Sequence, residues 1–253
     1  TDISQVHHDY LEYTKTPLIY ALNHFPDNLP LFQKLIEKGS DMSIGDESYA
    51  TPLDYVMIGH GSLEVQDFLR QSGLKLHTFA NPREAELHAF VKTGVDYGWG
   101  DRTAYHRIIE LLDAGVDPNC KDGYGCTPLH YALAKQIPCF IKELLQYGAD
   151  PNARDNEGRT PLFYYHRSYG GNGAIISDFV KSGADVNAID NHGRTILMHA
   201  TNIKDDHDMR SVIETFLWLK ADTTSTDPDG NTFMHYAVVK KIGIDAESII
   251  NLA

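Results

Sequence analysis

The sequence contains little cysteine and no long apolar segment. Only three of its 253 residues are cysteines, Cys120, Cys126 and Cys139. A small, odd number of cysteines argues against the disulfide framework of a secreted domain and favours a reducing compartment such as the cytoplasm. No apolar run approaches the roughly 18 residues that a membrane-spanning helix needs, so we expect no membrane role.

Positive charge is also scarce. The chain has 22 Lys and Arg residues against 35 Asp and Glu residues, which gives a formal net charge of −13. Phosphate backbones and anionic membranes repel a chain with this balance. We therefore expect no nucleic-acid partner, and a protein partner whose surface is basic or neutral.

Catalytic and metal-binding motifs are missing as well. The glycine-rich stretches GHGS (59–62) and YGGNG (169–173) match neither a phosphate-binding loop nor a nucleophile elbow. Cys120, Cys126 and His130 offer three potential zinc ligands, whereas a structural zinc site needs four that converge. The sequence therefore predicts no enzyme within this chain, no catalytic residue, no cofactor and no metal.

What the sequence does contain is a repeat built on a Thr-Pro-Leu phrase, as in TPLHYALAK (127–135). Its copies start near residues 16, 51, 85, 127, 160, 195 and 232, and the third has Ala85 in place of Thr. A Gly-x-Asp phrase precedes the next copy by a constant 12 residues, as from Gly148 to Thr160. The rest of each repeat varies in length. A rigid connector between repeats and an adaptable loop inside each repeat explain this difference.

The residue types predict two helices in each repeat. Thr is a good N-cap and Pro suits the first helical position, so the Thr-Pro-Leu phrase begins one helix. The glycine of the Gly-x-Asp phrase ends the second helix in a left-handed conformation, with Lys220 at this position in the sixth copy. The second helices carry a wide apolar stripe that only stacked neighbours can bury. The connector contains Asp-x-x-Gly, which suits a tight turn at the tip of a finger.

These features resemble the ankyrin repeat family. The resemblance rests on GADPN (148–152), GADVN (183–187), GVDPN (115–119) and the Thr-Pro-Leu-His phrases. It implies an all-α fold with short β-hairpin fingers, an α-solenoid of stacked helix-turn-helix units. We expect a single domain over 1–253, with an N-terminal cap at 1–14. The last repeat is incomplete, so we expect further protein beyond residue 253.

The family resemblance implies a protein–protein interaction scaffold that binds through its concave face and its fingertips. The alternative is the recognition or regulatory part of a larger enzyme whose catalytic domain lies outside this chain. A less favoured form places a small active site in the insertion at 94–105, with Asp96, Trp99, Asp101 and Arg102. The irregular insertions also resemble those of ankyrin proteins that intracellular bacteria deliver into host cells. Such an effector would meet host proteins in the host cytosol.

Two sets of residues are candidates for partner binding. Tyrosines recur four positions after the Thr position and would form a ladder. They either pack between helices with their hydroxyls outward or line the concave face, and both readings stay open. The ladder comprises Tyr20, Tyr55, Tyr131, Tyr164 and Tyr236. The fingertip candidates are Tyr49, Phe79, Tyr124, Asn156, Glu157, Arg159, His192 and Arg194.

Two further positions carry expectations. His88, His130 and His235 lie three positions after the Thr position, where the family resemblance implies that the ring braces the turn through hydrogen bonds to the backbone. Asn119 and Asn152 close the Gly-x-Asp-x-Asn phrase, where the resemblance implies possible targets of an asparaginyl hydroxylase. The alternative is that these side chains only stabilise the turn.

Overall fold

The computed structural model describes residues 16–45, 50–59, 61–72, 81–93, 102–165, 173–203 and 206–239. The chain forms two compact units, Thr1–Gly123 (unit 1) and Tyr124–Ala253 (unit 2). The regular elements of the described residues are helices, and this confirms the predicted all-α fold class. Two isolated antiparallel bridges, Ile189–Thr195 and Thr226–Thr232, close fingers in unit 2. In the described residues the expected hairpins are therefore single bridges.

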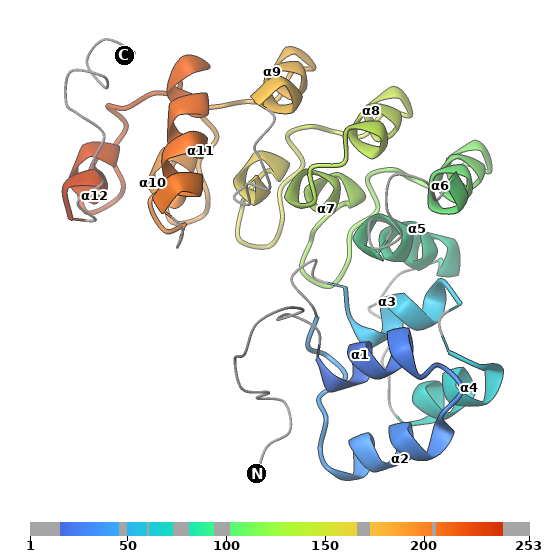
Figure 1. Ribbon diagram of the computed structural model, residues 1–253. Helices are drawn as coiled ribbons and strands as arrows, with labels where there is room; N and C mark the ends of the chain where they lie inside the picture. Colours follow the sequence, from blue (N-terminus) through green and yellow to red (C-terminus); the bar gives the residue numbers. More distant parts are fainter. Residues whose placement is uncertain are drawn as a thin grey trace. The chain divides into compact units, whose positions relative to one another are not determined.

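The described residues of unit 1 form three pairs of helices (Figure 1). The first helices of the pairs lie in a row, because α3 packs against both α1 and α5. In the second layer α2 packs against α1 and α4, and α6 packs against α5. The pairs are α1 (Pro17–His24) with α2 (Leu29–Glu37), α3 (Pro52–Met57) with α4 (Leu63–Gln71), and α5 (Pro82–Thr93) with α6 (Arg102–Asp113).

Unit 2 repeats this arrangement, and its first elements have four to seven residues (Figure 1). The 3-10 helix η2 packs against α7 and α10, and α12 packs on α10. In the second layer α8 packs on α7 and α11 packs on α10. The elements are α7 (Pro128–Ala134), α8 (Pro138–Gln146), η2 (Pro161–Tyr164), α9 (Gly173–Lys181), α10 (Ile196–Ala200), α11 (Asp206–Trp218) and α12 (Phe233–Val239).

Three of the Thr residues cap their helices through the side chain as predicted, whereas Thr127 and Thr160 make no such bond. The hydroxyl oxygens of Thr16, Thr51 and Thr195 accept hydrogen bonds from the backbone N–H three residues later, at 3.4 to 3.5 Å. These bonds satisfy donors that a helix start leaves without an intrahelical partner. In the third repeat, which lacks this Thr, the helix begins earlier, at Pro82.

The second helices end in left-handed residues. Lys220 has a φ of 63° in the sixth copy, where the other repeats use glycine. A side chain in this conformation meets its own backbone, so a non-glycine residue is strained there. The corresponding glycines have φ between 80° and 100°, at Gly39, Gly115, Gly148 and Gly183.

The Lys220→Gly variant is therefore expected to be more stable than the parent chain by about 1 kcal/mol, because it relieves this strain. Chemical denaturation measures the change. The converse variant, Gly183→Ala, introduces the same strain at a φ of +100° and is expected to lose a similar amount. A Lys220→Gly variant less stable than the parent would contradict the strain at this position.

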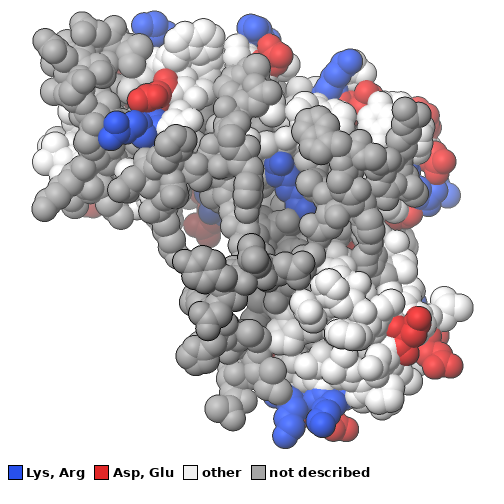
Figure 2. All heavy atoms as spheres, viewed as in Figure 1, with Lys and Arg blue, Asp and Glu red and all other residues white. Residues whose placement is uncertain are grey.

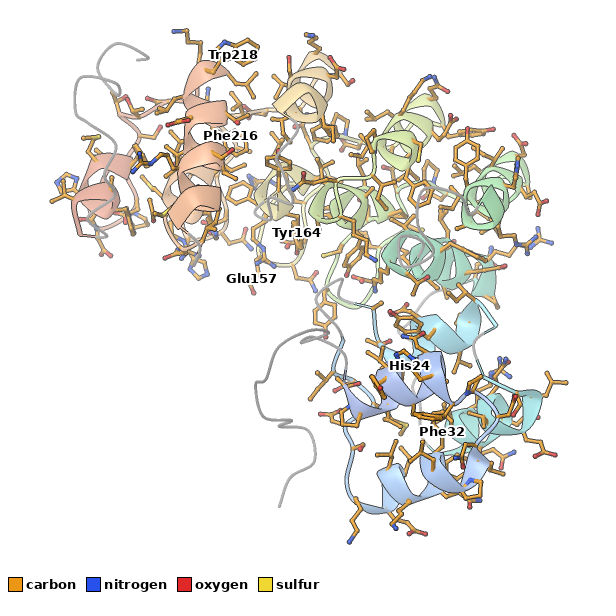
Figure 3. All side chains as sticks on the ribbon, viewed as in Figure 1. His24, Phe32, Glu157, Tyr164, Phe216 and Trp218 are labelled. Atoms are coloured by element: carbon orange, nitrogen blue, oxygen red, sulfur yellow. The ribbon has the colours of Figure 1, made fainter. Side chains whose placement is uncertain are left out.

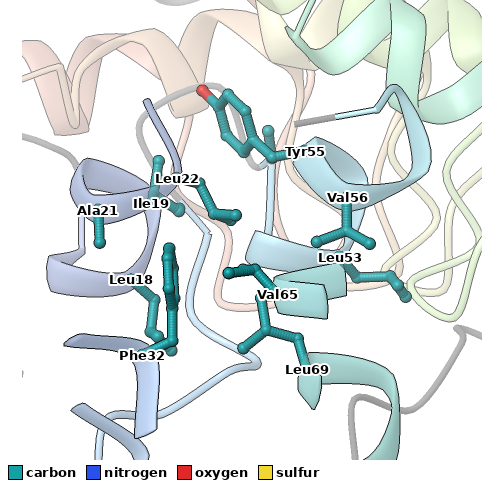
Figure 4. Packing of buried hydrophobic residues seen from close by; sticks show 11 residues of the cluster. Leu18, Ile19, Ala21, Leu22, Phe32, Leu53, Tyr55, Val56, Val65 and Leu69 are labelled. Carbon is teal, nitrogen blue, oxygen red and sulfur yellow. The ribbon is translucent and has the colours of Figure 1, made fainter. Parts of the chain in front are cut away.

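The core of unit 1 shows how a repeated tyrosine can be used for packing. Tyr55 is 1% exposed, and its ring lies beside aliphatic side chains from α1, α3 and α4. Figure 4 shows its hydroxyl oxygen at the end that points away from the other labelled side chains. The cluster around it includes Leu18, Ile19, Leu22, Phe32, Leu53, Val56, Val65 and Leu69.

Candidate functional site

Three fingers of unit 2 have the same backbone turn. In each, the N–H of an aspartate donates to the carbonyl four residues later, as from Asp155 to Arg159 at 2.9 Å. The same bond joins Asp190 to Arg194 and Asp227 to Asn231. A glycine with φ between 70° and 82° lies inside each turn. The Asp-x-x-Gly phrase therefore forms the tight turn that the sequence predicts.

The aspartate of the first of these fingers is clamped by four hydrogen bonds. The side chain of Asp155 is fully buried. It accepts from the backbone N–H groups of Glu157 and Arg159, both at 2.8 Å, and from Nε of Arg159 at 2.8 Å. The hydroxyl of Tyr164 donates the fourth bond at 2.6 Å. Burial raises the pKa of Asp155, but the bonds from Tyr164 and Arg159 outweigh it and lower the pKa.

The next two fingers repeat this clamp. Asp190 accepts two bonds from Arg194 Nε and Nη2, and Asp227 accepts one from Asn231 Nδ2. The residue nine positions after each aspartate closes the clamp: His199 Nε2 lies 2.7 Å from Asp190, and the Tyr236 hydroxyl donates to Asp227 at 2.6 Å. Burial lowers the pKa of His199, so its neutral ring donates the Nε2 proton to Asp190.

The burial of the rings decides between the two interpretations of the tyrosine ladder for three of its members. Tyr55, Tyr131 and Tyr164 are 1%, 2% and 6% exposed. A buried ring offers no contact area to a partner, so these three tyrosines serve packing. The structure therefore does not place them on a partner-binding surface, where the sequence had suggested them as candidates. Tyr20 is 43% exposed and Tyr236 is half-buried. Only these two of the five keep surface for a partner.

Neighbouring fingertips in unit 2 are joined through their backbones. The N–H of Asn156 donates to the carbonyl of Tyr124 at 3.0 Å, and that of Asn191 donates to the carbonyl of Glu157 at 2.8 Å. The Asn191 side chain also donates to the Asn156 carbonyl at 3.0 Å. A Cβ atom at Gly125 would collide with Asn156, so the tips approach as closely as glycine allows. The three tips form one continuous row.

The tips carry exposed side chains of mixed chemistry. Tyr124 is 56% exposed, and Asn156, Glu157 and His192 are exposed as well. The Glu157 carboxylate lies 3.4 Å from His192 Nε2. Figure 3 shows Glu157 at the end of its finger and Tyr164 inside the unit.

The other predicted fingertip residues differ from these four. Arg159 and Arg194 are about one-third exposed, and each guanidinium binds the aspartate of its own finger. They hold the fingers in place and offer only part of their surface to a partner. Tyr49 and Phe79 lie outside the described residues.

Unit 1 carries a group of exposed aromatic side chains. The sequence predicted only one member of this group, Tyr20. The ring centroids of Tyr20 and His24 are 4.3 Å apart, and those of Tyr20 and Phe25 are 6.4 Å apart. Phe25 is 48% exposed. These three residues at the end of α1, the Tyr20 cluster, present aromatic surface that core packing does not use.

The histidine position braces the turn, as the family resemblance implies. Nδ1 of His130 accepts the N–H of Thr127 at 3.0 Å, so Nε2 carries the proton and donates to the Arg159 carbonyl at 3.2 Å. In the second repeat Asp54 replaces histidine and accepts the N–H of Thr51 at 2.7 Å. The ring therefore ties the start of a helix to the next finger.

Unit 1 also contains a buried cation that sequence reasoning missed. Lys92 is 1% exposed, and its Nζ lies 3.3 Å from Asp122 Oδ2 and 3.8 Å from Asp54 Oδ2. Both carboxylates are buried too. The signal in the sequence was a lysine inside the otherwise apolar end of AELHAFVKT (85–93). Since a buried charge is costly without a partner, this ammonium and its two carboxylates depend on one another.

His88, one helical turn before Lys92, gives the stability of the chain a pH dependence. Its Nε2 donates to the Cys120 carbonyl at 3.0 Å. Burial, and then the charge of Lys92, lower the pKa of His88 to about 4. Between pH 6.5 and 4 the unfolded chain binds a proton at this residue and the folded chain does not. Stability therefore falls as pH falls through this window, by up to about 3 kcal/mol.

The His88→Gln variant is expected to lose most of this pH dependence, because glutamine can donate to the Cys120 carbonyl but does not titrate. Urea denaturation at several pH values between 4 and 7 measures it. The matched control is His106→Gln, which removes an exposed histidine. Equal pH slopes for the two variants would show that His88 is not the group responsible.

The predicted modification sites have structural roles. Nδ2 of Asn152 donates to the Gly183 carbonyl at 2.8 Å, and its Oδ1 accepts the N–H of Asp185 at 2.8 Å. This amide therefore links two successive loops. The backbone N–H of Asn119 donates to the Asp117 carboxylate at 2.8 Å. Turn stabilisation accounts for these contacts, and hydroxylation at either asparagine remains a prediction.

The insertion at 94–105 carried the candidates for a small active site. Asp96, Trp99 and Asp101 lie outside the described residues, as does the side chain of Arg102. Within the described residues, no group of three or more His, Cys, Asp or Glu side chains is arranged to hold a metal ion. Likewise, no described helix combines the length and apolarity that crossing a bilayer requires. All three cysteines are free thiols.

Comparison with known proteins agrees with this geometry. Residues 102–168 match the family described as "Ankyrin repeats (3 copies)". Among curated proteins, none matches the chain. Ankyrin repeats are generally protein–protein interaction modules and are not catalytic themselves. The match includes the left-handed helix ends at Gly115 and Gly148 and the finger clamped at Asp155, and it supports the assignment of residues 102–168 to the ankyrin repeats.

Proposed function

We propose that the chain binds a partner protein through the fingertip row of unit 2, formed by Tyr124, Asn156, Glu157 and His192. The Tyr20 cluster of unit 1 provides a further contact surface. The observation that carries this proposal is the pair of backbone hydrogen bonds that joins the three tips into one row. Exposed side chains on a row fixed in advance lose little conformational entropy on binding.

The chemistry of the tips favours a protein partner. Tyr124 offers apolar area together with a hydroxyl, and tyrosine is enriched among residues that dominate binding energy. Asn156 offers both a donor and an acceptor, and Glu157 offers a carboxylate. The buried clamps below the tips, at Asp155 and Asp190, fix the backbone of the fingers, while the side chains of the tips stay exposed.

The charge of the chain favours a basic or neutral partner surface. The net charge of −13 speeds association with a basic partner at low salt. On the face seen in Figure 2, acidic and basic side chains are interspersed over the described residues. Charge therefore sets the rate of association, and the tip residues set the position of docking.

Several broader expectations form part of this proposal. We assign the repeats to a single domain over 1–253. We place the binding activity in the cytoplasm, and we assign no catalysed reaction to this chain. The free thiols support a reducing compartment. An effector origin, with host proteins as partners in the host cytosol, remains a prediction from the irregular insertions. So does a regulatory role within a larger enzyme.

The proposal is tested by affinity measurements on a partner identified by capture from a native lysate. Tyr124→Ala is expected to raise Kd by about tenfold or more, the size of a binding hot spot. The control is Tyr147→Ala, which removes a less exposed tyrosine, 36% against 56% for Tyr124, at the end of α8. Equal affinities for the two variants would show that the partner does not contact the fingertip row.

A further inference from the structure

Unit 2 contains a groove between its outer helices α9 and α11. Asp178 and Lys181 of α9 and Ser211, Glu214, Thr215 and Trp218 of α11 line it, and its volume is about 530 Å³. This volume is in the range of sites that bind small groups. Figure 3 shows Trp218 on the opposite side of unit 2 from Glu157, so the groove shares no residue with the fingertip row.

Trp218 presents an indole ring at the edge of this groove. It is 62% exposed, whereas the preceding Phe216 and Leu217 are 0% and 1% exposed. Helix α11 therefore buries its apolar side through those two residues, and Trp218 is not needed for the core. The face of an indole ring attracts cations more strongly than any other aromatic side chain.

The charges in the groove leave one carboxylate uncompensated. Lys181 pairs with Asp178 at 3.0 Å, so these two charges cancel. Glu214 is exposed and forms no ion pair within the part of the chain that the structure describes. It precedes Trp218 by four residues on the same helix, which places both side chains on one face of α11. A negative charge thus lies beside the indole.

Hydrogen-bond acceptors complete the groove. The Thr215 hydroxyl donates its proton to the Ser211 carbonyl at 2.8 Å, so its oxygen can only accept from a ligand. An anionic ligand would meet Glu214 and the Asp178 carboxylate. A guanidinium group, by contrast, can stack on Trp218, pair with Glu214 and donate to Thr215. Arginine suits this set better than lysine because its planar group stacks and donates in several directions.

We infer that the groove between α9 and α11 is a second binding site, which takes an arginine side chain from an extended segment of a partner protein. The inference does not depend on the fingertip proposal. A partner that uses both surfaces would gain affinity from their combination.

Fluorescence of Trp218 tests this site directly. The Trp99→Phe variant leaves Trp218 as the single tryptophan of the chain. A capped glycine–serine peptide with a pair of arginines is titrated into this variant, and the same peptide with citrulline in place of arginine is the neutral comparison. The arginine peptide is expected to change Trp218 emission saturably. Its Kd is expected to rise with added salt, since exposed charges are screened.

Substitutions assign the effect to the groove. Anisotropy of a labelled arginine peptide is expected to show Kd increased about threefold to fivefold by Glu214→Gln, the size of one exposed ion pair. Trp218→Leu is expected to weaken binding at least as much. The control Glu64→Gln removes an exposed carboxylate from α4 and should leave Kd unchanged. Equal binding of the citrulline peptide, no binding of either peptide, or an unchanged Kd in Glu214→Gln would each overturn the inference.

Discussion

Lys92→Met is expected to lower the free energy of unfolding by about 3–5 kcal/mol, the cost of leaving buried charges without their partner. The Lys92 ammonium lies between the carboxylates of Asp54 and Asp122, and all three groups are buried. Methionine fills a similar volume but supplies no charge, so two carboxylates stay buried without a cation. Chemical denaturation followed by circular dichroism measures the loss.

Two comparison variants isolate the charge. Lys34→Met makes the same change at an exposed position of α2 and is expected to stay within about 0.5 kcal/mol of the parent. Adding Asp122→Asn to Lys92→Met removes one of the uncompensated charges and should restore part of the stability. A Lys92→Met chain as stable as the parent would contradict the account of this buried cluster.

Asp155→Ala is expected to cost about 3 kcal/mol or more, because its carboxylate satisfies several buried donors at once. Two backbone N–H groups, the Arg159 guanidinium and the Tyr164 hydroxyl all lose their acceptor. The finger then loses the group that fixes its turn. The melting temperature and the free energy of unfolding report this loss.

The neighbouring tyrosine gives a graded comparison. Tyr164→Phe removes one of the four bonds to Asp155, together with the contacts of the hydroxyl with Arg159 Nη2 at 3.0 Å and Cys126 Sγ at 3.1 Å, and should cost about 1 kcal/mol. Tyr20→Phe removes the hydroxyl of an exposed member of the same ladder and should be nearly neutral. If all three variants had the same stability, the clamp at Asp155 would contribute nothing, and the packing role of Tyr164 would rest on its ring alone.

The elements of the fold could be predicted from the sequence because their signals are local. Thr16 and Thr51 cap helices through bonds that span three residues. The left-handed ends at Gly148 and Lys220 follow from the positions where the apolar stripes stop. Such signals depend on a few adjacent residues. Helix starts and ends can therefore be predicted without knowledge of how the repeats pack or what partner they bind.

The site was harder to predict because its contacts join residues that a linear pattern does not pair. The Asp-x-x-Gly phrase indicated a turn, but the bond from Asp155 to Tyr164 forms only when the finger folds back onto the helix start. An aromatic stripe at helical spacing fits either side of a helix, so Tyr131 could not be assigned to the core in advance. Lys92 was overlooked because its partner Asp122 lies 30 residues away.

Amide hydrogen exchange of the free protein tests the preformed fingertip row most directly. Asn156 and Asn191 are exposed residues whose N–H groups donate to the neighbouring tips, so their exchange is expected to be slowed at least about 100-fold relative to an unstructured chain. In Asp155→Ala, Asn156 should lose this protection. Exchange of both amides at unstructured rates in the parent chain would mean that no binding surface is fixed before the partner arrives.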